Sequence, residues 1–175
     1  QGISKHKALK YINITYIEII RAVPVLVMIL WIYYGLPVLV GINFSAFTAG
    51  IIALSICDRP FIAEIFRSGF EAVPKGQSEA GTSLGMRFYQ RFRYIILPQA
   101  TKIILPALGN QFVYMLKMSS LVSIIGLNEL TRKANELVVS QYRPLEIYTF
   151  LVLEYLVLIL IISYLVRRME RKLSN

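Results

Sequence analysis

No Asp, Glu, Lys, Arg or His interrupts residues 22–57, AVPVLVMILWIYYGLPVLVGINFSAFTAGIIALSIC. As a single helix rising ~1.5 Å per residue, this stretch would extend roughly 54 Å, whereas the hydrocarbon core of a bilayer is about 30 Å thick. The chain must therefore turn inside it. Glycine tolerates positive φ and proline fixes φ, and such turn-favouring residues lie near the middle: Gly35, Pro37, Gly41 and Asn43. The pattern predicts two membrane-spanning helices, near residues 22–40 and 46–68.

Two further apolar stretches follow along the chain. One extends over residues 103–125 and the other over residues 147–166, and each is interrupted by a single charged residue. Hydrophobic residues make up 56% of the sequence, more than the about 45–50% that is typical of soluble domains. The two stretches predict helices near residues 101–125 and 146–166. We therefore predict an all-α membrane protein with four transmembrane helices in a single domain, residues 1–175.

Positively charged residues gather at three places, and the formal net charge is +9. They precede the first predicted span, lie between the second and third, and follow the fourth: Lys5, Lys7, Lys10 and Arg21; Arg67, Lys75, Arg87, Arg91 and Arg93; and Arg167, Arg168, Arg171 and Lys172. The turn near Gly41 has no Lys or Arg, and the longer connection has Arg132, Lys133 and Arg143. Because cytoplasmic loops are enriched in Lys and Arg, both ends and the loop at residues 69–98 are predicted to be cytoplasmic, and nucleic-acid binding is disfavoured.

The loop between the second and third predicted spans is expected to contain a short polar helix. Pro74 suits the start of a helix, and Gly85 suits the left-handed residue that ends one. Ala80, Gly81 and Gly85 give this helix a surface of small residues that another backbone can approach closely. A second, amphipathic stretch over residues 88–95 leads back into the membrane.

This loop resembles the motif of ABC importer inner-membrane permeases, which reads E-A-A-x-x-x-G, then nine residues, then I-x-L-P. The matching residues are Glu79, Ala80, Gly81, Gly85, Ile95, Leu97 and Pro98. Gly81 alone departs from the motif, where it replaces alanine and loosens the helix by up to about 1 kcal/mol. The resemblance implies that Glu79 to Gly85 couples this chain to a separate ATPase subunit.

The similarity extends over nearly the whole chain and indicates the polar amino-acid permeases of the histidine and glutamine type. It is carried by residues 16–18, 21–24, 33–37, 63–67, 73–77, 121–126, 129–132 and 143–148. Members of that family have a type I ABC importer transmembrane domain with a core of five helices. The four helices predicted here would be the second to fifth, so the first is expected to be missing from this sequence.

The resemblance also implies partners and a location. Such a permease pairs with itself or with a similar subunit and docks on a dimer of ABC ATPase subunits, which bind ATP and Mg. An extracytoplasmic amino-acid-binding protein delivers the substrate. The permease is expected to lie among the lipids of the bacterial cytoplasmic membrane as a multi-pass protein.

The chain itself is expected to have no catalytic residue, metal site or bound cofactor. Gly76 and Gly81 have the separation of a phosphate-binding loop, but Thr82 follows where that loop needs a lysine. His6 is the one histidine and Cys57 the one cysteine in the sequence, so neither a metal-ligand cluster nor a disulfide framework is predicted. ATP hydrolysis is therefore expected on a partner subunit, and the chain is not an enzyme.

A zwitterionic amino acid that crosses the membrane needs polar partners for its ammonium and carboxylate groups. Candidates in the predicted spans are Asp58, Arg59, Glu64, Lys117, Ser119, Ser120 and Glu154. A charge near the bilayer centre costs on the order of 2.5–3.5 kcal/mol, so these side chains should face protein or water. For Glu64 and Lys117, a structural interhelical ion pair or a contact between permease subunits is an equally good interpretation. Pro60 is expected to kink its helix, and the resemblance assigns no role to Asp58 or Arg59.

Two other classes of protein fit parts of the sequence. An ion-coupled secondary carrier or channel would use Asp58, Glu64 and Glu154 as a proton or cation relay, but such carriers usually contain inverted repeats, and none is evident. A scaffold that only anchors a partner enzyme has no reason to bear the cost of charges in the membrane. Neither class explains the loop motif. The sequence leaves open which amino acid is carried and whether the permease is a homodimer or a heterodimer.

Overall fold

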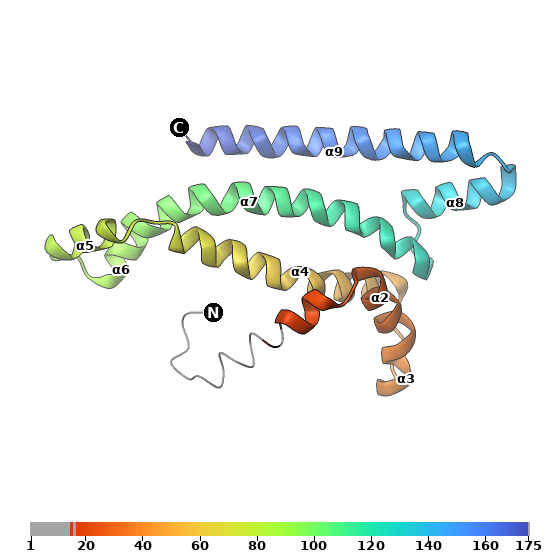
Figure 1. Ribbon diagram of the computed structural model, residues 1–175, viewed down its shortest axis with the longest axis horizontal. Coiled ribbons are helices and arrows are strands. Elements are labelled where there is room, and N and C mark those ends of the chain that lie inside the picture. The colour runs from red at the N-terminus through yellow and green to blue at the C-terminus, as the bar shows by residue number, and fades with distance from the viewer. Residues whose placement is uncertain (1–14, 16, 175) are drawn as a thin grey trace. The chain divides into compact units, whose positions relative to one another are not determined.

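The computed structural model describes residue 15 and residues 17–174, with side chains up to residue 171. All regular elements in this part of the chain are helical (Figure 1). They are α2 (Val25–Leu30), the π-helical turn η1 (Trp31–Gly35), α3 (Leu36–Val40), α4 (Ala46–Glu71), α5 (Lys75–Ser83), α6 (Phe88–Arg91), the π-helical turn η2 (Phe92–Ile96), α7 (Leu97–Met118), the 3-10 helix η3 (Ser119–Ile125), α8 (Leu130–Gln141) and α9 (Pro144–Ser174). The predicted all-helical architecture is confirmed for these residues. The basic cluster of Lys5, Lys7 and Lys10 and His6 lie outside them.

The first predicted span is helical without interruption from Val25 to Val40. The prediction that Gly35 and Pro37 turn the chain is wrong, because both lie inside this helical stretch. Leu36 donates its N–H to the carbonyl of Trp31, five residues earlier, and this wider π-turn lets the helix continue into Pro37, which has no N–H to donate. The turn itself comes at Gly41, where φ is 70°.

Two of the helices in the described residues are long and apolar enough to cross a membrane by themselves: α4 over Ala46–Glu71 and α9 over Pro144–Arg171. The first predicted span corresponds to a shorter apolar helix, Val25–Val40. The third predicted span is helical as well, but α7 ends at Met118 and the chain tightens into η3. Its polar side chains explain why α7 does not meet the same criterion: Gln99, Lys102, Asn110, Gln111 and Lys117. Four helical stretches are therefore found where four spans were predicted, and two of them are long and apolar enough to cross a membrane by themselves.

The chain divides into two compact units. The first comprises residues 1–60 and 113–161, and the second comprises residues 61–112 and 162–175. The core of the first unit is built by fully buried aliphatic side chains of α2, η1, α4 and η3: Ile29, Ile32, Ala49, Ala53, Val122 and Ile125. α4 remains one helix through Pro60, which is the last residue of the first of the two segments in this unit.

The second unit contains the end of α4, the helices α5 to α7 and the end of α9. Its core consists of Val73, Ala100 and Ile104, which pack against half-buried Ile65, Phe70, Ile96 and Leu108. Two glycines let helices approach closely: a Cβ atom at Gly69 of α4 would overlap Cγ1 of Ile104, and one at Gly109 of α7 would overlap Cγ1 of Val166. At these two positions, a residue larger than glycine would overlap a side chain of the neighbouring helix.

The crossing of α4 and α7 predicts a size-compensation experiment. Gly69→Ala should lower the free energy of unfolding by about 1–3 kcal/mol, because the added methyl group overpacks the contact. Adding Ile104→Ala to that variant removes the side-chain atoms that the new Cβ meets, so the second change should cost less than in the wild type. Thermal unfolding of the chain in detergent measures both effects. Strict additivity of the two substitutions would contradict the crossing.

Candidate functional site

The predicted polar helix of the loop is confirmed as α5, Lys75–Ser83. Pro74 precedes its first turn with φ −59° and ψ 131°. At the other end, Met86 N–H donates to the carbonyl of Gly81 at 3.0 Å, and Gly85 N–H donates to the carbonyl of Thr82 at 2.9 Å. These two bonds form a Schellman motif, in which the residue after the helix is left-handed. Gly85 has φ 74°, as the sequence predicted.

Gly81 lies on the inner face of α5. It is buried, and a Cβ atom there would come within 2.9 Å of Ile95 Cδ1 and 3.0 Å of Arg91 Cγ. The close approach that the sequence predicted at Gly81 is made here by residues of the same chain. The glycine that departs from the family motif lets α5 lie directly on η2, while Ala80 and Gly85 are exposed.

Arg91 fastens α5 to the segment that follows it. Its Nη1 donates to the hydroxyl Oγ1 of Thr82 and, at 3.4 Å, to the carbonyl of Ser78. The aliphatic part of the side chain covers Gly81. The sequence placed Arg91 among the basic residues that indicate topology and in the amphipathic stretch at residues 88–95, and it did not predict the contacts of Arg91 with α5.

Phe92 connects this assembly to α4. Its ring stacks on Phe70, near the end of α4, with ring centroids 5.9 Å apart, and on Phe88 of α6 at 6.3 Å. η2 then passes directly into α7, where Leu97 donates its N–H to the carbonyl of Phe92 ahead of Pro98. The loop is therefore a packed unit that is continuous with the membrane helices α4 and α7.

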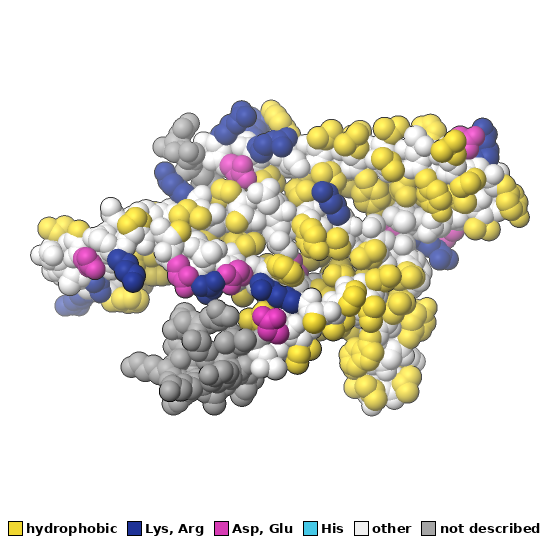
Figure 2. Space-filling model, viewed as in Figure 1, with side chains coloured by type: hydrophobic (Ala, Val, Ile, Leu, Met, Phe, Trp, Pro, Cys, Tyr) yellow, Lys and Arg dark blue, Asp and Glu magenta, His cyan; other side chains and the backbone are white. Residues whose placement is uncertain are grey.

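The motif residues fall into two groups in this assembly. Ile95 and Leu97 are half-buried and belong to its interior, whereas Glu79 and Pro98 are exposed. Large apolar side chains lie open beside Glu79's helix: Leu84 is 81% exposed, and Phe88 of α6 is 71% exposed. Apolar, acidic and basic side chains alternate over this part of the surface (Figure 2). Exposed apolar groups framed by polar ones are typical of a protein-binding surface.

The contacts of Arg91 with α5 can be tested by hydrogen exchange. Arg91→Met retains an apolar stem over Gly81 but loses the charged donor, whose hydrogen bonds are worth about 1.5–3 kcal/mol. Amide exchange over residues 75–85 should accelerate at least tenfold, which corresponds to 1.4 kcal/mol. The control is Arg93→Met, because Arg93 is exposed. Equal exchange rates in the two variants would show that Arg91 does not hold α5.

Two of the predicted substrate-path residues, Lys117 and Ser120, line a cavity of about 550 Å³ in the first unit. Thr131 and Tyr155 contribute further polar groups, and the remaining wall is apolar: Leu151, Val152, Leu156 and Ile159. The sequence analysis missed Thr131 and Tyr155. A tyrosine next to Glu154 in an otherwise apolar helix was the available signal.

The polar wall of this cavity is fixed by Glu129. Its carboxylate accepts the backbone N–H of Thr131 at 2.9 Å and of Arg132 at 2.6 Å, and so caps the start of α8. The hydroxyl of Tyr155 donates to the same carboxylate at 3.1 Å and lies 3.1 Å from the Thr131 hydroxyl. α8 and α9 are thereby joined at the rim of the cavity.

The other candidates lie elsewhere. Asp58 is buried on α4 and Arg59 is exposed, while Glu154 is exposed on α9 and does not line the cavity. Ser119 donates its hydroxyl to the carbonyl of Leu116 at 2.7 Å. Of the seven candidates, Lys117 and Ser120 are among the residues that line this cavity, and the other five are not.

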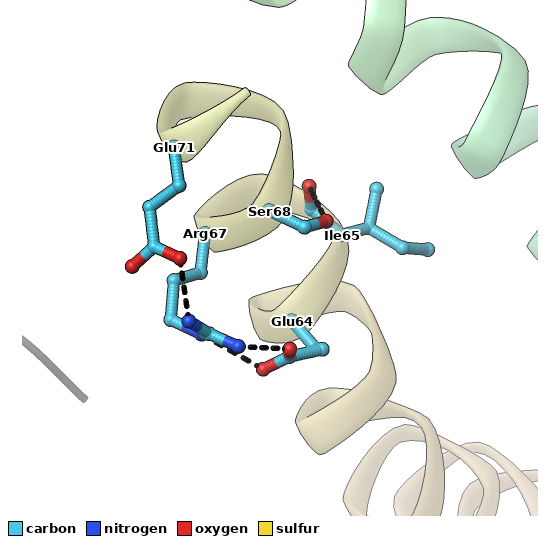
Figure 3. Close-up of polar contacts among 5 residues, drawn as sticks. All are labelled: Glu64, Ile65, Arg67, Ser68 and Glu71. Carbon is cyan, nitrogen blue, oxygen red and sulfur yellow. Dashed lines mark hydrogen bonds and ion pairs between the residues drawn. The ribbon is translucent and has the colours of Figure 1, made fainter. Parts of the chain in front are cut away.

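Glu64 takes part in an ion-pair network on one face of α4 (Figure 3). Arg67 donates from Nε to Glu64 Oε2 at 3.0 Å, and its Nη2 pairs with Glu64 Oε1. The same guanidinium donates from Nη1 to Glu71 Oε2 at 2.7 Å. Both of these pairs lie within α4. The sequence left three interpretations of Glu64 open, namely substrate binding, an ion pair between helices and a contact between permease subunits, and ion pairs within one helix were not among them.

In the part of the chain that the structure describes, no three His, Cys, Asp or Glu side chains come together in a way that could hold a metal ion. The arrangement offers instead a packed loop with an exposed face and a separate polar cavity between helices.

Comparisons with known proteins cover almost the entire chain. The family model for "Binding-protein-dependent transport system inner membrane component" matches residues 2–175. The glutamine transport system permease protein GlnP of Escherichia coli (strain K12) is 37% identical over 165 residues, which are 94% of this chain and 75% of GlnP. The probable glutamine ABC transporter permease protein GlnM of Bacillus subtilis (strain 168) is 39% identical over 173 residues, which are 99% of this chain and 80% of GlnM.

A solved structure is similar as well. The crystal structure of an amino acid ABC transporter with histidines contains a chain that is 46% identical in sequence. The two superpose with a TM-score of 0.87, and the match covers 97% of this chain and 79% of that one.

Proposed function

The chain belongs to the binding-protein-dependent transport system inner membrane components as a permease of ABC amino-acid importers, and from this premise we propose that it carries polar amino acids and couples to a separate ATPase through residues 74–98. The substrate class is supported by two relatives that are named as glutamine permeases and by the similar solved transporter, whose structure contains histidines. Glutamine and histidine share a polar side chain of intermediate size.

The packing of α5 on η2 is the observation that carries the coupling proposal. A coupling element must transmit a displacement without absorbing it, because switching transitions move rigid elements against one another. Gly81 and Arg91 fix α5 to η2, and Phe92 links η2 to the end of α4. A push on the exposed face of α5, where Glu79 lies, therefore reaches two membrane helices together.

The assembly follows from this assignment. Two permease subunits, identical or similar, dock through α5 on a dimer of ATPase subunits that bind ATP and Mg, and an extracytoplasmic binding protein delivers the amino acid. The chain is a component of the inner membrane. The distribution of Lys and Arg supports an orientation with both ends of this chain and the loop at residues 69–98 in the cytoplasm.

The cavity beside Lys117 is proposed as part of the translocation path. It is large enough for one amino acid, and a cavity with an apolar wall and a few convergent polar groups is typical of a small-molecule site. The Lys117 ammonium would pair with the substrate carboxylate, and the hydroxyl groups of Ser120 and Thr131 would hydrogen-bond its polar groups. Glu129, which orients Thr131 and Tyr155, acts on the substrate only through them.

Substitution of Glu79 tests the coupling proposal. Glu79→Gln removes the charge from the exposed face of α5 and leaves the packing of Gly81 unchanged, so the complex should assemble but substrate should no longer stimulate ATP hydrolysis. ATPase activity and uptake are measured on the same proteoliposomes. Glu136→Gln on α8 is the matched control, because Glu136 is also an exposed carboxylate. Normal substrate-stimulated hydrolysis in Glu79→Gln would remove this residue from the coupling surface.

Substitution of Lys117 tests the substrate path. Loss of a charge-assisted hydrogen bond to the carboxylate is worth about 1.5–3 kcal/mol, so Lys117→Ala should lower uptake at limiting substrate by about 10- to 100-fold. Lys133→Ala is the control, because Lys133 is exposed on α8 and pairs with Glu136 at 2.8 Å. Unchanged affinity and rate in Lys117→Ala would exclude this residue from the path, and the same assay on Arg59→Ala tests the candidate outside the cavity.

A further inference from the structure

A second polar cavity lies between α7 and α9 in the second unit. Its volume is about 340 Å³, and it is lined by Lys102 and Pro106 of α7 and by Glu170 and Arg171 of α9. Neither the coupling surface nor the cavity at Lys117 includes these residues. Two cationic groups and one carboxylate therefore face a space to which the transport function assigns no ligand.

The cavity lies beside a close contact between the two helices. α7 and α9 run in opposite directions (Figure 1), and a Cβ atom at Gly109 would overlap Cγ1 of Val166. Lys102 precedes Gly109 by seven residues, about 10 Å of helix, and Arg171 follows Val166 by five residues, about 7 Å. Both basic residues therefore lie on the same side of this contact.

The level of this cavity in the membrane follows from α9. From Tyr155 to Val166 this helix carries no charged residue, and Arg167 and Arg168 follow immediately. Such a change marks the boundary between hydrocarbon and headgroups, because Lys and Arg extend their charged ends to the interface. The cavity with Arg171 is thus placed at the level of the lipid phosphates.

The charges of the cavity suit a phosphate. Within residues 17–171, neither Lys102 nor Arg171 forms an ion pair or hydrogen bond. Arg binds phosphate oxygens with two parallel N–H donors. Arg167 and Arg168 add positive charge on the same helix end, and Figure 2 shows Lys and Arg side chains gathered around the C-terminal end of α9.

From this arrangement we propose that the cavity binds the headgroup of an anionic glycerophospholipid, and specifically that of phosphatidylglycerol. Lys102 and Arg171 bind the phosphate, as in other basic pockets between membrane helices. Glu170 accepts hydrogen bonds from the hydroxyl groups of the glycerol headgroup, which phosphatidylcholine does not have. The acyl chains extend from the cavity along the apolar surface of α9.

Lipid competition tests this site. The full chain in detergent is incubated with equal amounts of phosphatidylglycerol and phosphatidylcholine of identical acyl chains, and the lipids that it retains are quantified by native mass spectrometry. Each basic residue near a lipid surface contributes about 1 kcal/mol, about a fivefold change in affinity. The preference of the wild type for phosphatidylglycerol should therefore fall about 25-fold in the double variant Lys102→Gln, Arg171→Gln.

The matched control is the double variant Arg87→Gln, Arg93→Gln. It removes the same charge from exposed positions of the second unit outside the cavity, and its lipid preference should stay within about twofold of the wild type, allowing for weak surface electrostatics. Equal losses in both double variants would show general charge attraction and overturn the site. Displacement of the lipid by millimolar inorganic phosphate would also overturn it, because the ligand would then be a soluble anion.

Two further measurements keep the test independent of folding defects in the variants. Lys102→Arg with Arg171→Lys retains both charges and should retain the preference. In the wild type, phosphatidylglycerol with a photoreactive headgroup should crosslink to peptides that contain Lys102 or Arg171. Crosslinks confined to other peptides would contradict the proposal. None of these measurements uses transport, so their failure would leave the importer function untouched.

Discussion

Close approach of backbones is the constraint on which the second unit depends, and it is met only where one partner has no side chain. Gly69 lets α4 lie on α7, Gly109 lets α7 lie on α9, and Gly81 lets α5 lie on η2. In a membrane, where lipid tails are as apolar as the helix surfaces, close packing at small residues is a main source of helix association. The same contacts connect the loop directly to the helices that flank it.

Proline imposes a second constraint, and the chain meets it twice in the same way. Within hydrocarbon every backbone N–H must find a partner in the protein, and a proline cannot continue the usual ladder. Before Pro37 and before Pro98, a π-helical turn shifts the hydrogen bonds to carbonyls five residues earlier, and the helix continues. One of these turns connects the coupling loop to α7 without a flexible joint.

The sequence predicted the helical fold, the short helix α5 and its left-handed end at Gly85, because charge distribution, periodicity and glycine chemistry are local signals. The type I ABC importer architecture is confirmed by the similarity of the chain to the solved amino acid transporter. The sequence did not predict that Gly81 faces inward, that Arg91 lies over it, or that Tyr155 meets Glu129. Each of these contacts joins residues that are far apart along the chain or on different helices, and a single sequence does not specify such pairing. Gly35 and Pro37 misled the prediction because their turn chemistry is overridden by a π-turn.

The measurement that tests the central claim most directly is amino-acid uptake by reconstituted proteoliposomes. The chain is assembled with and without its ATPase and binding protein, and labelled polar amino acids are offered with and without ATP. Uptake that requires both partners and ATP is the predicted result, because we propose that this chain forms the path and couples to a separate ATPase subunit that binds the nucleotide. Uptake by the chain alone, driven by an ion gradient and indifferent to ATP, would contradict the account and identify a secondary carrier.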